Sequence, residues 1–161
     1  MNKYSLEIPD KLLRKIKDHA RSAYPAECCG ILFGKHDEAG NKDERVINIS
    51  EVTAAENLVN REGQKRYFVI DSMFIYRTER EAADRGLDIV GFYHSHPDAP
   101  AVLSGEDEEG MIPGQVFMIL SAAGDGQTAR EVTECTAWIK TDNLVNIIKA
   151  SPWGEAVTEG D

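Results

Sequence analysis

The feature that most constrains the fold is an apolar run that ends directly in two histidines. Residues Ile89-Val90-Gly91-Phe92-Tyr93 are nearly continuous apolar sequence, and His94-Ser95-His96 follows without a break. Such a strand is expected to be covered on both faces, as the central strands of α/β sheets are. The chain has 161 residues, 42% of them apolar, which suffices for one domain with a real core. The run therefore predicts a single α/β domain, a mixed sheet with helices packed on it.

Other short apolar stretches, separated by turn residues, predict the rest of the sheet. Strands are expected at residues 4–8, 28–33, 45–53, 67–70, 88–94, 116–121 and 131–140, and residues 144–148 fit either a strand or a helix. Residues 36–44 have the composition of a hairpin loop. Residues 54–65 form a polar connection, and whether it orders only when substrate binds is left open.

Two helices are expected between these strands. The first opens at Pro9-Asp10 and ends at Tyr24-Pro25, and the second runs from Asp71 or Ser72 to about Arg85, before Gly86. Their spacing predicts core contacts by Leu12, Leu13, Ile16, Ala20 and Ala23 in the first helix, and by Met73, Ile75, Tyr76 and Ala83 in the second. The basic residues of the first helix fit a solvated face better than a binding patch.

Charge and cysteine content exclude several classes of protein. The 28 acidic and 18 basic residues give a net charge of −10, which lacks the basic footprint of a general nucleic-acid binder. No apolar run approaches the roughly 18 residues of a membrane-spanning helix. Cys28, Cys29 and Cys135 form neither a disulfide framework nor a C-x-x-C motif, and buried packing is expected of Cys28 and Cys29. Because no apolar signal segment begins the chain, we expect a cytoplasmic protein without nucleic-acid or membrane partners.

The two histidines at the strand end are candidate metal ligands. Positions i and i+2 of a strand point to the same face, with α-carbons about 6.6 Å apart. His94 and His96 can therefore converge on one ion, and Asp107, brought back by a Pro- and Gly-containing loop, is the natural third ligand. Three protein ligands with an open fourth position are typical of catalytic zinc. His19 and His36 are expected at the surface.

Other interpretations of these residues stay open on spacing alone. Ser104-x-x-Asp107 is also a helix N-cap signature, although capping by Ser104 and metal binding by Asp107 are compatible. A non-haem iron site also uses two histidines and a carboxylate, usually in another order along the chain. The patterns of cupin-type sites, zinc deaminases and His-Glu-x-x-His zincins are absent.

Two motifs together resemble the JAMM/MPN+ metalloproteases. The stretch from His94 to Asp107 matches H-[ST]-H-x7-S-x-x-D at every defining position, with Leu103 where many relatives have proline. Upstream, Pro25-Ala26-Glu27-Cys28-Cys29-Gly30-Ile31-Leu32-Phe33-Gly34 resembles the P-x-E-x-C-G-x-L-x-G segment of the small prokaryotic branch. The resemblance implies a three-layer α-β-α sandwich related to cytidine deaminases.

The resemblance also implies roles for five residues. His94, His96 and Asp107 would hold one zinc ion, Glu27 would be the general acid/base, and Ser104 would hydrogen-bond the tetrahedral intermediate. Without the family pattern, Glu27 would be read as an exposed acid before a strand. Residues 1–150 would be the JAMM/MPN+ domain and residues 151–161 an acidic C-terminal tail.

The expected activity is cleavage of an amide bond at the C-terminal Gly-Gly tail of a ubiquitin-like or sulfur-carrier protein. Small bacterial relatives of this appearance resemble the sulfur-carrier-protein–cysteine hydrolases, and the tail is expected to add to an exposed strand edge near the metal. Two rivals are a non-catalytic MPN scaffold and a metal-dependent hydrolase or oxygenase of small molecules. A homodimer is left open.

Overall fold

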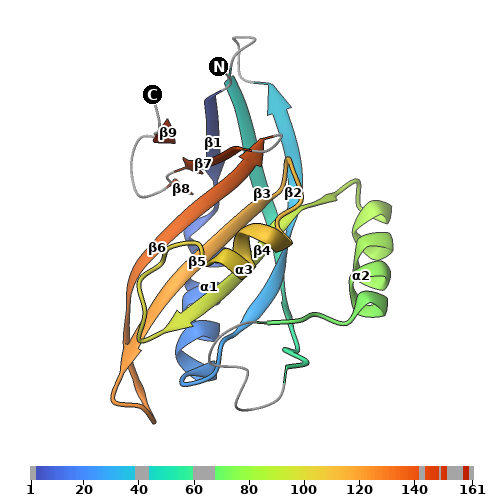
Figure 1. Cartoon of the computed structure of the whole chain (residues 1–161). Coiled ribbons are helices and arrows are strands. Elements are labelled where there is room, and N and C mark those ends of the chain that lie inside the picture. The colour runs from blue at the N-terminus through green and yellow to red at the C-terminus, as the bar shows by residue number, and fades with distance from the viewer. Residues whose placement is uncertain are drawn as a thin grey trace.

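The computed structural model describes residues 3–38, 44–59, 68–141, 144–148, 150–151 and 158–159 (Figure 1). The helices are α1 (Asp10–Ala23), α2 (Ser72–Asp84) and α3 (Gly105–Gly110). The strands are β1 (Lys3–Glu7), β2 (Cys29–Glu38), β3 (Glu44–Ala55), β4 (Asp88–Pro97), β5 (Val116–Gly124), β6 (Ala129–Thr141), β7 (Leu144–Ile148), β8 (Ala150–Ser151) and β9 (Thr158–Glu159). The described strands form one sheet in the order β8-β1-β3-β2-β4-β5-β6-β7-β9.

Strand β4 lies in the middle of this sheet, as its apolar run predicted. It pairs antiparallel with β2 and parallel with β5, so the sheet is mixed. A side chain at Gly91 would place its Cβ 2.0 Å from the Val116 carbonyl oxygen of β5, so only glycine permits this close approach. The strand therefore carries the two histidines of its far end into the interior of the molecule.

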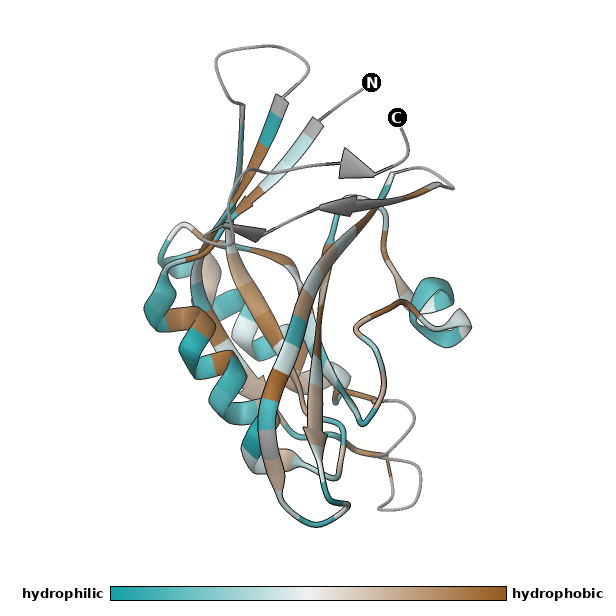
Figure 2. Cartoon of the chain, turned by 90° about the vertical axis from the view of Figure 1, so that its left-hand side faces the viewer, coloured by the Kyte–Doolittle hydropathy of each residue, from teal (hydrophilic) through white to brown (hydrophobic). Residues whose placement is uncertain are grey.

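The helices lie on both faces of the sheet. Helix α1 covers one face, whereas α2 and α3 lie on the other, and Figure 2 shows α1 and α3 on opposite sides. Leu13, Ile16 and Ala20 of α1 are buried in the main apolar core, and Leu12 and Ala23 pack against it, as predicted. This arrangement confirms the three-layer α-β-α sandwich.

Helix α2 packs through a different face from the predicted one. Met73 and Tyr76 are 59% and 50% exposed, and Ala83 is exposed as well, so three of the four predicted core contacts are wrong. Ile75 does pack, beside Phe74 and the fully buried Ala82. Residues 74, 78 and 82 lie at helical spacing on one face of α2. A hydrophobicity pattern does not include Thr78, because it is polar, but its hydroxyl is satisfied by donating to the Phe74 carbonyl of the same helix.

One strand prediction and two loop predictions also need correction. Residues 68–70 of the expected strand at 67–70 form no strand, because Val69 bonds to Leu58 and the Asn57 side chain rather than to a ladder; residue 67 lies outside the described residues. The hairpin loop predicted at 36–44 is shorter, since β2 continues to Glu38 and β3 begins at Glu44. The predicted connection 54–65 begins inside β3, and its residues 60–65 lie outside the described residues.

The end of the chain joins the sheet in part. Residues 144–148, which fitted strand or helix, form β7, and β9 pairs antiparallel with it inside the predicted tail. Residues 152–157 and 160–161 of that tail lie outside the described part. Among the described helices, none has the length and apolar character needed to cross a membrane.

Candidate active site

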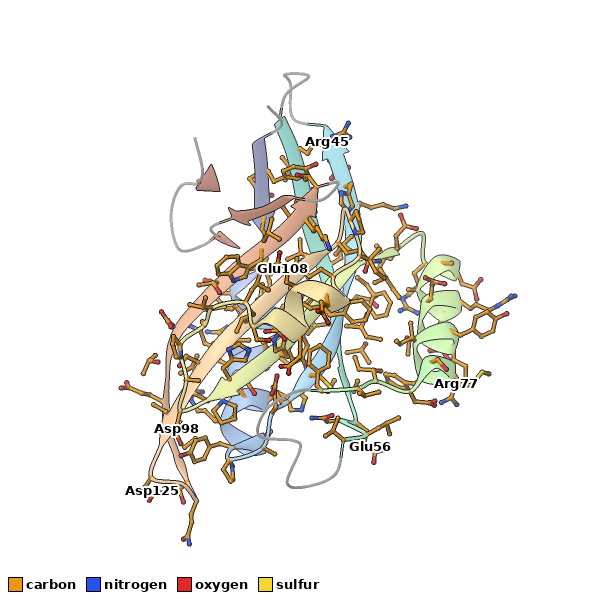
Figure 3. The ribbon with its side chains drawn as sticks, in the orientation of Figure 1. Arg45, Glu56, Arg77, Asp98, Glu108 and Asp125 are labelled. Atoms are coloured by element: carbon orange, nitrogen blue, oxygen red, sulfur yellow. The ribbon has the colours of Figure 1, made fainter. Side chains whose placement is uncertain are left out.

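Four side chains from three separate segments meet at the end of β4. His94 and His96 come from β4, Asp107 from α3, and Glu27 from the segment before β2. One potential ligand atom of each lies within 4.8 Å of those of the other three. The structure thus brings together every residue for which a metal-site or acid/base role was predicted, with Ser104 at the start of α3 beside them. Figure 3 shows α3, marked by Glu108, lying over β4 in the orientation of Figure 1.

The pairing of β2 with β4 explains how Glu27 reaches the histidines across the sequence. Cys29 stands opposite His94 in the register of the two strands. Ser95 extends the pairing by one residue. Its backbone N–H donates to the Cys28 carbonyl at 3.1 Å, and its hydroxyl accepts from the Cys28 N–H at 2.9 Å. These bonds hold the residue that follows Glu27 against the residue that separates the two histidines. No sequence pattern singled out Ser95 except its place between them.

Asp107 caps its helix and faces the histidines at once. Its N–H donates to the Ser104 hydroxyl and its Oδ2 accepts from the Ser104 N–H, both at 3.0 Å, which makes a reciprocal capping box. Its Oδ1 lies 3.1 Å from His94 Nε2, and its Oδ2 lies 3.1 Å from His96 Nε2. The two interpretations of the Ser104–Asp107 spacing are therefore compatible in this geometry.

Each imidazole is oriented by further contacts. His96 Nδ1 lies 2.9 Å from the Pro100 carbonyl, and because a carbonyl only accepts, Nδ1 carries a proton and Nε2 faces Asp107. The ring of His94 is fully buried between Phe68, stacked at 4.6 Å, and Phe117, edge-on at 5.6 Å. Sequence analysis missed both phenylalanines, because nothing in their local pattern indicates contact with residue 94.

The donor atoms fit a divalent cation. Glu27 Oε1 and both ring nitrogens of His94 are buried and make no well-aligned hydrogen bond among the described residues, although His94 Nε2 lies 3.1 Å from Asp107 Oδ1. Two ligands of a tetrahedral zinc ion lie about 3.4 Å apart when each bond is about 2.1 Å. The 3.1 Å separations between Asp107 and the imidazoles suit that spacing, whereas Glu27 Oε1 stands 3.9 Å from His94 Nε2. Two imidazoles and one carboxylate are ligands that zinc accepts.

Burial sets the protonation of these groups. It raises the pKa of Glu27 to about 8 and lowers the pKa of His94, which favours the neutral imidazole. Burial also acts to raise the pKa of Asp107, but its contacts with His94 and His96 outweigh burial and hold that pKa well below its usual range. The cluster therefore combines a fixed carboxylate, a neutral imidazole and a carboxyl group able to exchange a proton near neutral pH.

The other histidines and the cysteines lie apart from this chemistry. Burial raises the pKa of Cys28 and Cys29 to about 12, so both are inert thiols in the core, as expected. His36 is exposed, as predicted. The prediction for His19 is wrong: it is half-buried, with Nδ1 2.8 Å from the Tyr93 hydroxyl.

A cleft opens beside Asp107 on the α2 and α3 face. Its volume is about 310 Å³, and its lining is mainly apolar: Phe68, Ile70, Ile75, Phe92, Glu106, Asp107, Gly110, Ile112 and Phe117. Strands β2, β4 and β5 around the cluster are each paired on both sides. Among the described strands these three therefore offer no free edge beside the cluster, and the cleft is an opening that reaches it.

Comparison with known proteins places this geometry in a family. A sequence profile for prokaryotic homologs of the JAB domain matches residues 9–139. The chain belongs to this family. The match includes all four residues of the cluster and confirms the resemblance to JAMM/MPN proteins.

Two characterised relatives are similar over most of their length. A desampylase of Haloferax volcanii is 35% identical over 126 residues, covering 77% of this chain and 82% of that protein. A desampylase of Pyrococcus furiosus is 30% identical over 146 residues, covering 90% of this chain and 89% of that protein. These relatives indicate a hydrolase of the JAMM family.

Solved structures share the fold. A solution structure of a Desulfitobacterium hafniense protein superposes with a TM-score of 0.70 at 24% identity and covers 90% of each chain. One from Salinibacter ruber superposes with a TM-score of 0.60 at 29% identity and covers 98% of this chain and 95% of that one. The first likeness supports the α/β architecture alone.

Proposed function

We propose that this protein is a zinc-dependent peptidase or isopeptidase that cleaves an amide bond at the C-terminal tail of a ubiquitin-like or sulfur-carrier protein. The observation that carries the proposal is a buried, proton-exchanging Glu27 carboxyl facing two imidazoles and a carboxylate with ligand spacing. A structural ion would need no such acid beside its ligands. The catalytic domain in this proposal is residues 1–150, followed by the acidic tail 151–161.

In this proposal His94, His96 and Asp107 hold the zinc ion. When bound, zinc supplies Lewis acidity, which lowers the pKa of a water beside it to about 7. Two ligands are ready for that task, because the low pKa of Asp107 keeps it a carboxylate and the low pKa of His94 keeps its imidazole neutral. Burial acts to lower the pKa of His96, but its contacts with Asp107 and Pro100 raise it overall, so Nε2 of His96 must give up its proton when the ion binds. The Pro100 carbonyl fixes the tautomer of His96.

Glu27 moves the proton of the reaction. Its carboxylate takes a proton from the attacking water as the water oxygen bonds to the amide carbon, and it then gives that proton to the leaving nitrogen as the C–N bond breaks. Burial raises the pKa of Glu27 to about 8 in the metal-free protein, and the positive charge of a bound zinc ion would lower it toward neutral pH, where both steps are possible. Ser104 Oγ accepts from the Asp107 N–H, so its own hydrogen can donate to the oxyanion that develops on the substrate carbonyl.

The similarity to desampylases supports a ubiquitin-like partner, since desampylases act on conjugates of ubiquitin-like proteins. A flexible Gly-Gly tail is thin enough to enter a cleft of about 310 Å³, where a folded domain cannot. We propose such a tail as the substrate, in the cytoplasm, with either a lysine side chain or a C-terminal cysteine as the leaving group. The second leaving group would connect the enzyme to cysteine biosynthesis.

Mass spectrometry of two defined substrates tests the proposal. One is a small carrier joined through Gly-Gly to a lysine peptide, and the other is the same carrier ending in Gly-Gly-Cys. We expect the zinc-loaded protein to cleave at least one, chelation to abolish cleavage, and added zinc to restore it. Binding of the carrier without cleavage would instead indicate a scaffold, and activity only on small amides would indicate a small-molecule hydrolase.

A further inference from the structure

The loop between β4 and α3 holds the group that orients His96. The Pro100 carbonyl accepts from His96 Nδ1 at 2.9 Å and also from the Val102 N–H at 2.9 Å. Any shift of Pro100 would therefore turn the imidazole whose Nε2 faces Asp107. The contacts that hold this loop in place therefore also determine the orientation of the His96 imidazole.

Side chains of β6 bind both backbone groups of the next residue, Ala101. The Thr136 hydroxyl donates to the Ala101 carbonyl at 2.6 Å, and a carboxylate oxygen of Glu134 accepts from the Ala101 N–H at 2.6 Å. Ala101 itself is fully buried. Neither β6 residue lies in a motif, and both lie more than 30 positions along the chain from Ala101.

The direction of the Thr136 bond is fixed by a neighbour. The indole N–H of Trp138 donates to Thr136 Oγ1 at 2.8 Å. Because an indole N–H can only donate, the threonine oxygen must accept there, and its single hydrogen is left for Ala101. The chain Trp138–Thr136–Ala101 therefore has one orientation, which suits a rigid support.

We infer that Thr136 and Glu134 are positioning residues, which act through Ala101 and the Pro100 carbonyl to hold His96 in its metal-binding orientation. The inference rests on the proposed function, because it assumes that His96 is a ligand. Strand β6 pairs with β5, and β5 pairs with β4, so the loop is fastened to the same sheet that carries the histidines. A group that hydrogen-bonds a ligating histidine directly, as the Pro100 carbonyl does, typically changes metal affinity by 10- to 100-fold when removed, and Thr136 and Glu134 act on that group through Ala101.

Cobalt titration of purified variants tests this inference. Thr136→Val removes the donor with little change of volume, and Glu134→Ala removes the acceptor at an exposed position. We expect each to weaken Co²⁺ binding at least tenfold and to alter the visible spectrum of the bound ion. Thr136→Ser and Glu134→Gln keep the two bonds and should restore both readings. Thr133→Val is the matched control, because this exposed β6 hydroxyl contacts the Ser121 carbonyl and not the loop.

The outcomes separate the inference from the function. Wild-type affinity and spectrum in both Thr136→Val and Glu134→Ala would overturn the positioning role while leaving the metal site intact. Failure of the wild-type protein itself to bind Co²⁺ or Zn²⁺ would overturn the proposed function. Thermal unfolding of each variant is measured alongside, and if Thr136→Val fails to fold, Glu134→Ala with its Gln rescue decides the question.

Discussion

The two faces of the sheet are built for different tasks. On the α1 face, Leu13, Ile16 and Ala20 join a continuous apolar core. On the α2 and α3 face, two carboxyl groups and two imidazoles gather beside an apolar cleft. The large apolar residues exposed within the described part all lie outside α1: Leu58, Val69, Met73, Tyr76, Val102 and Ile112.

The two faces differ in how their buried side chains contribute to the free energy of unfolding. Burying an apolar side chain stabilises the fold by about 1.5–3 kcal/mol, whereas a buried polar atom without a partner destabilises it by about 1–3 kcal/mol. The α1 face gains the first effect, and Glu27 and His94 impose the second on the other face. Substitutions on the α1 face should therefore change stability, and substitutions at the cluster should change metal binding and activity.

The largest expected effect is on the active-site face. Glu27→Gln removes the proton carrier with almost no change of shape, so kcat should fall by about 10²–10⁴-fold, or about 2.7–5.4 kcal/mol. Zinc content should stay at one ion per chain. Glu108→Gln, an exposed acid on α3, is the control and should keep full activity. Full activity in Glu27→Gln would remove Glu27 from the mechanism.

The reciprocal test is on the α1 face. Ile16 is fully buried, and Ile16→Ala should lower the free energy of unfolding by about 2–5 kcal/mol, because it leaves a cavity in the main core. Zinc affinity of the folded protein should change less than threefold. Urea denaturation and zinc titration check the two readings, and a loss of zinc affinity as large as the loss of stability would mean that the faces are not independent.

The active-site face should also make its own contribution to the pH dependence of stability. Burial raises the pKa of Glu27 to about 8 from 4.5, so the stabilisation of its protonated form is complete below about pH 4.5 and is lost as the pH rises through about 8. Denaturation of the metal-free protein should show a loss on the order of 2–4 kcal/mol between pH 5 and pH 8, relative to Glu27→Gln. Parallel curves for the two proteins would contradict the assignment.

The smallest effect on zinc affinity is expected at Phe68, which lies between the cluster and the apolar cleft. Phe68 stacks on His94 and lines the cleft, so Phe68→Leu should keep the apolar contact but lose about 0.5–1.5 kcal/mol of ring interaction. Zinc affinity should fall by up to about tenfold while overall stability changes little. Competition with a chromogenic chelator measures this, and an effect as large as that of His94→Ala would show that Phe68 does more than pack.

Sequence alone predicted the parts of the molecule that depend on local pattern. The central strand, the face of α1 and the grouping of His94, His96 and Asp107 follow from periodicity and motif spacing, and Glu27 followed only from the family resemblance. The packed face of α2 was mispredicted because it includes a polar residue, Thr78, which is half-buried and whose hydroxyl donates within its own helix. Phe68 and Thr136 were missed, and Ser95 stood in the H-[ST]-H motif without a role, because these roles arise from strand pairing and loop closure, which no short segment encodes.

The central claim is that His94, His96 and Asp107 bind one divalent cation while Glu27 stands beside it. A crystal structure of the zinc-loaded protein, with anomalous scattering recorded at the zinc edge, tests this most directly. The account predicts one zinc peak about 2.0–2.2 Å from two imidazole nitrogens and one Asp107 oxygen, with the Glu27 carboxyl outside bonding distance. A peak coordinated by cysteine sulfur, or no peak at this cluster in zinc-saturated crystals, would contradict it.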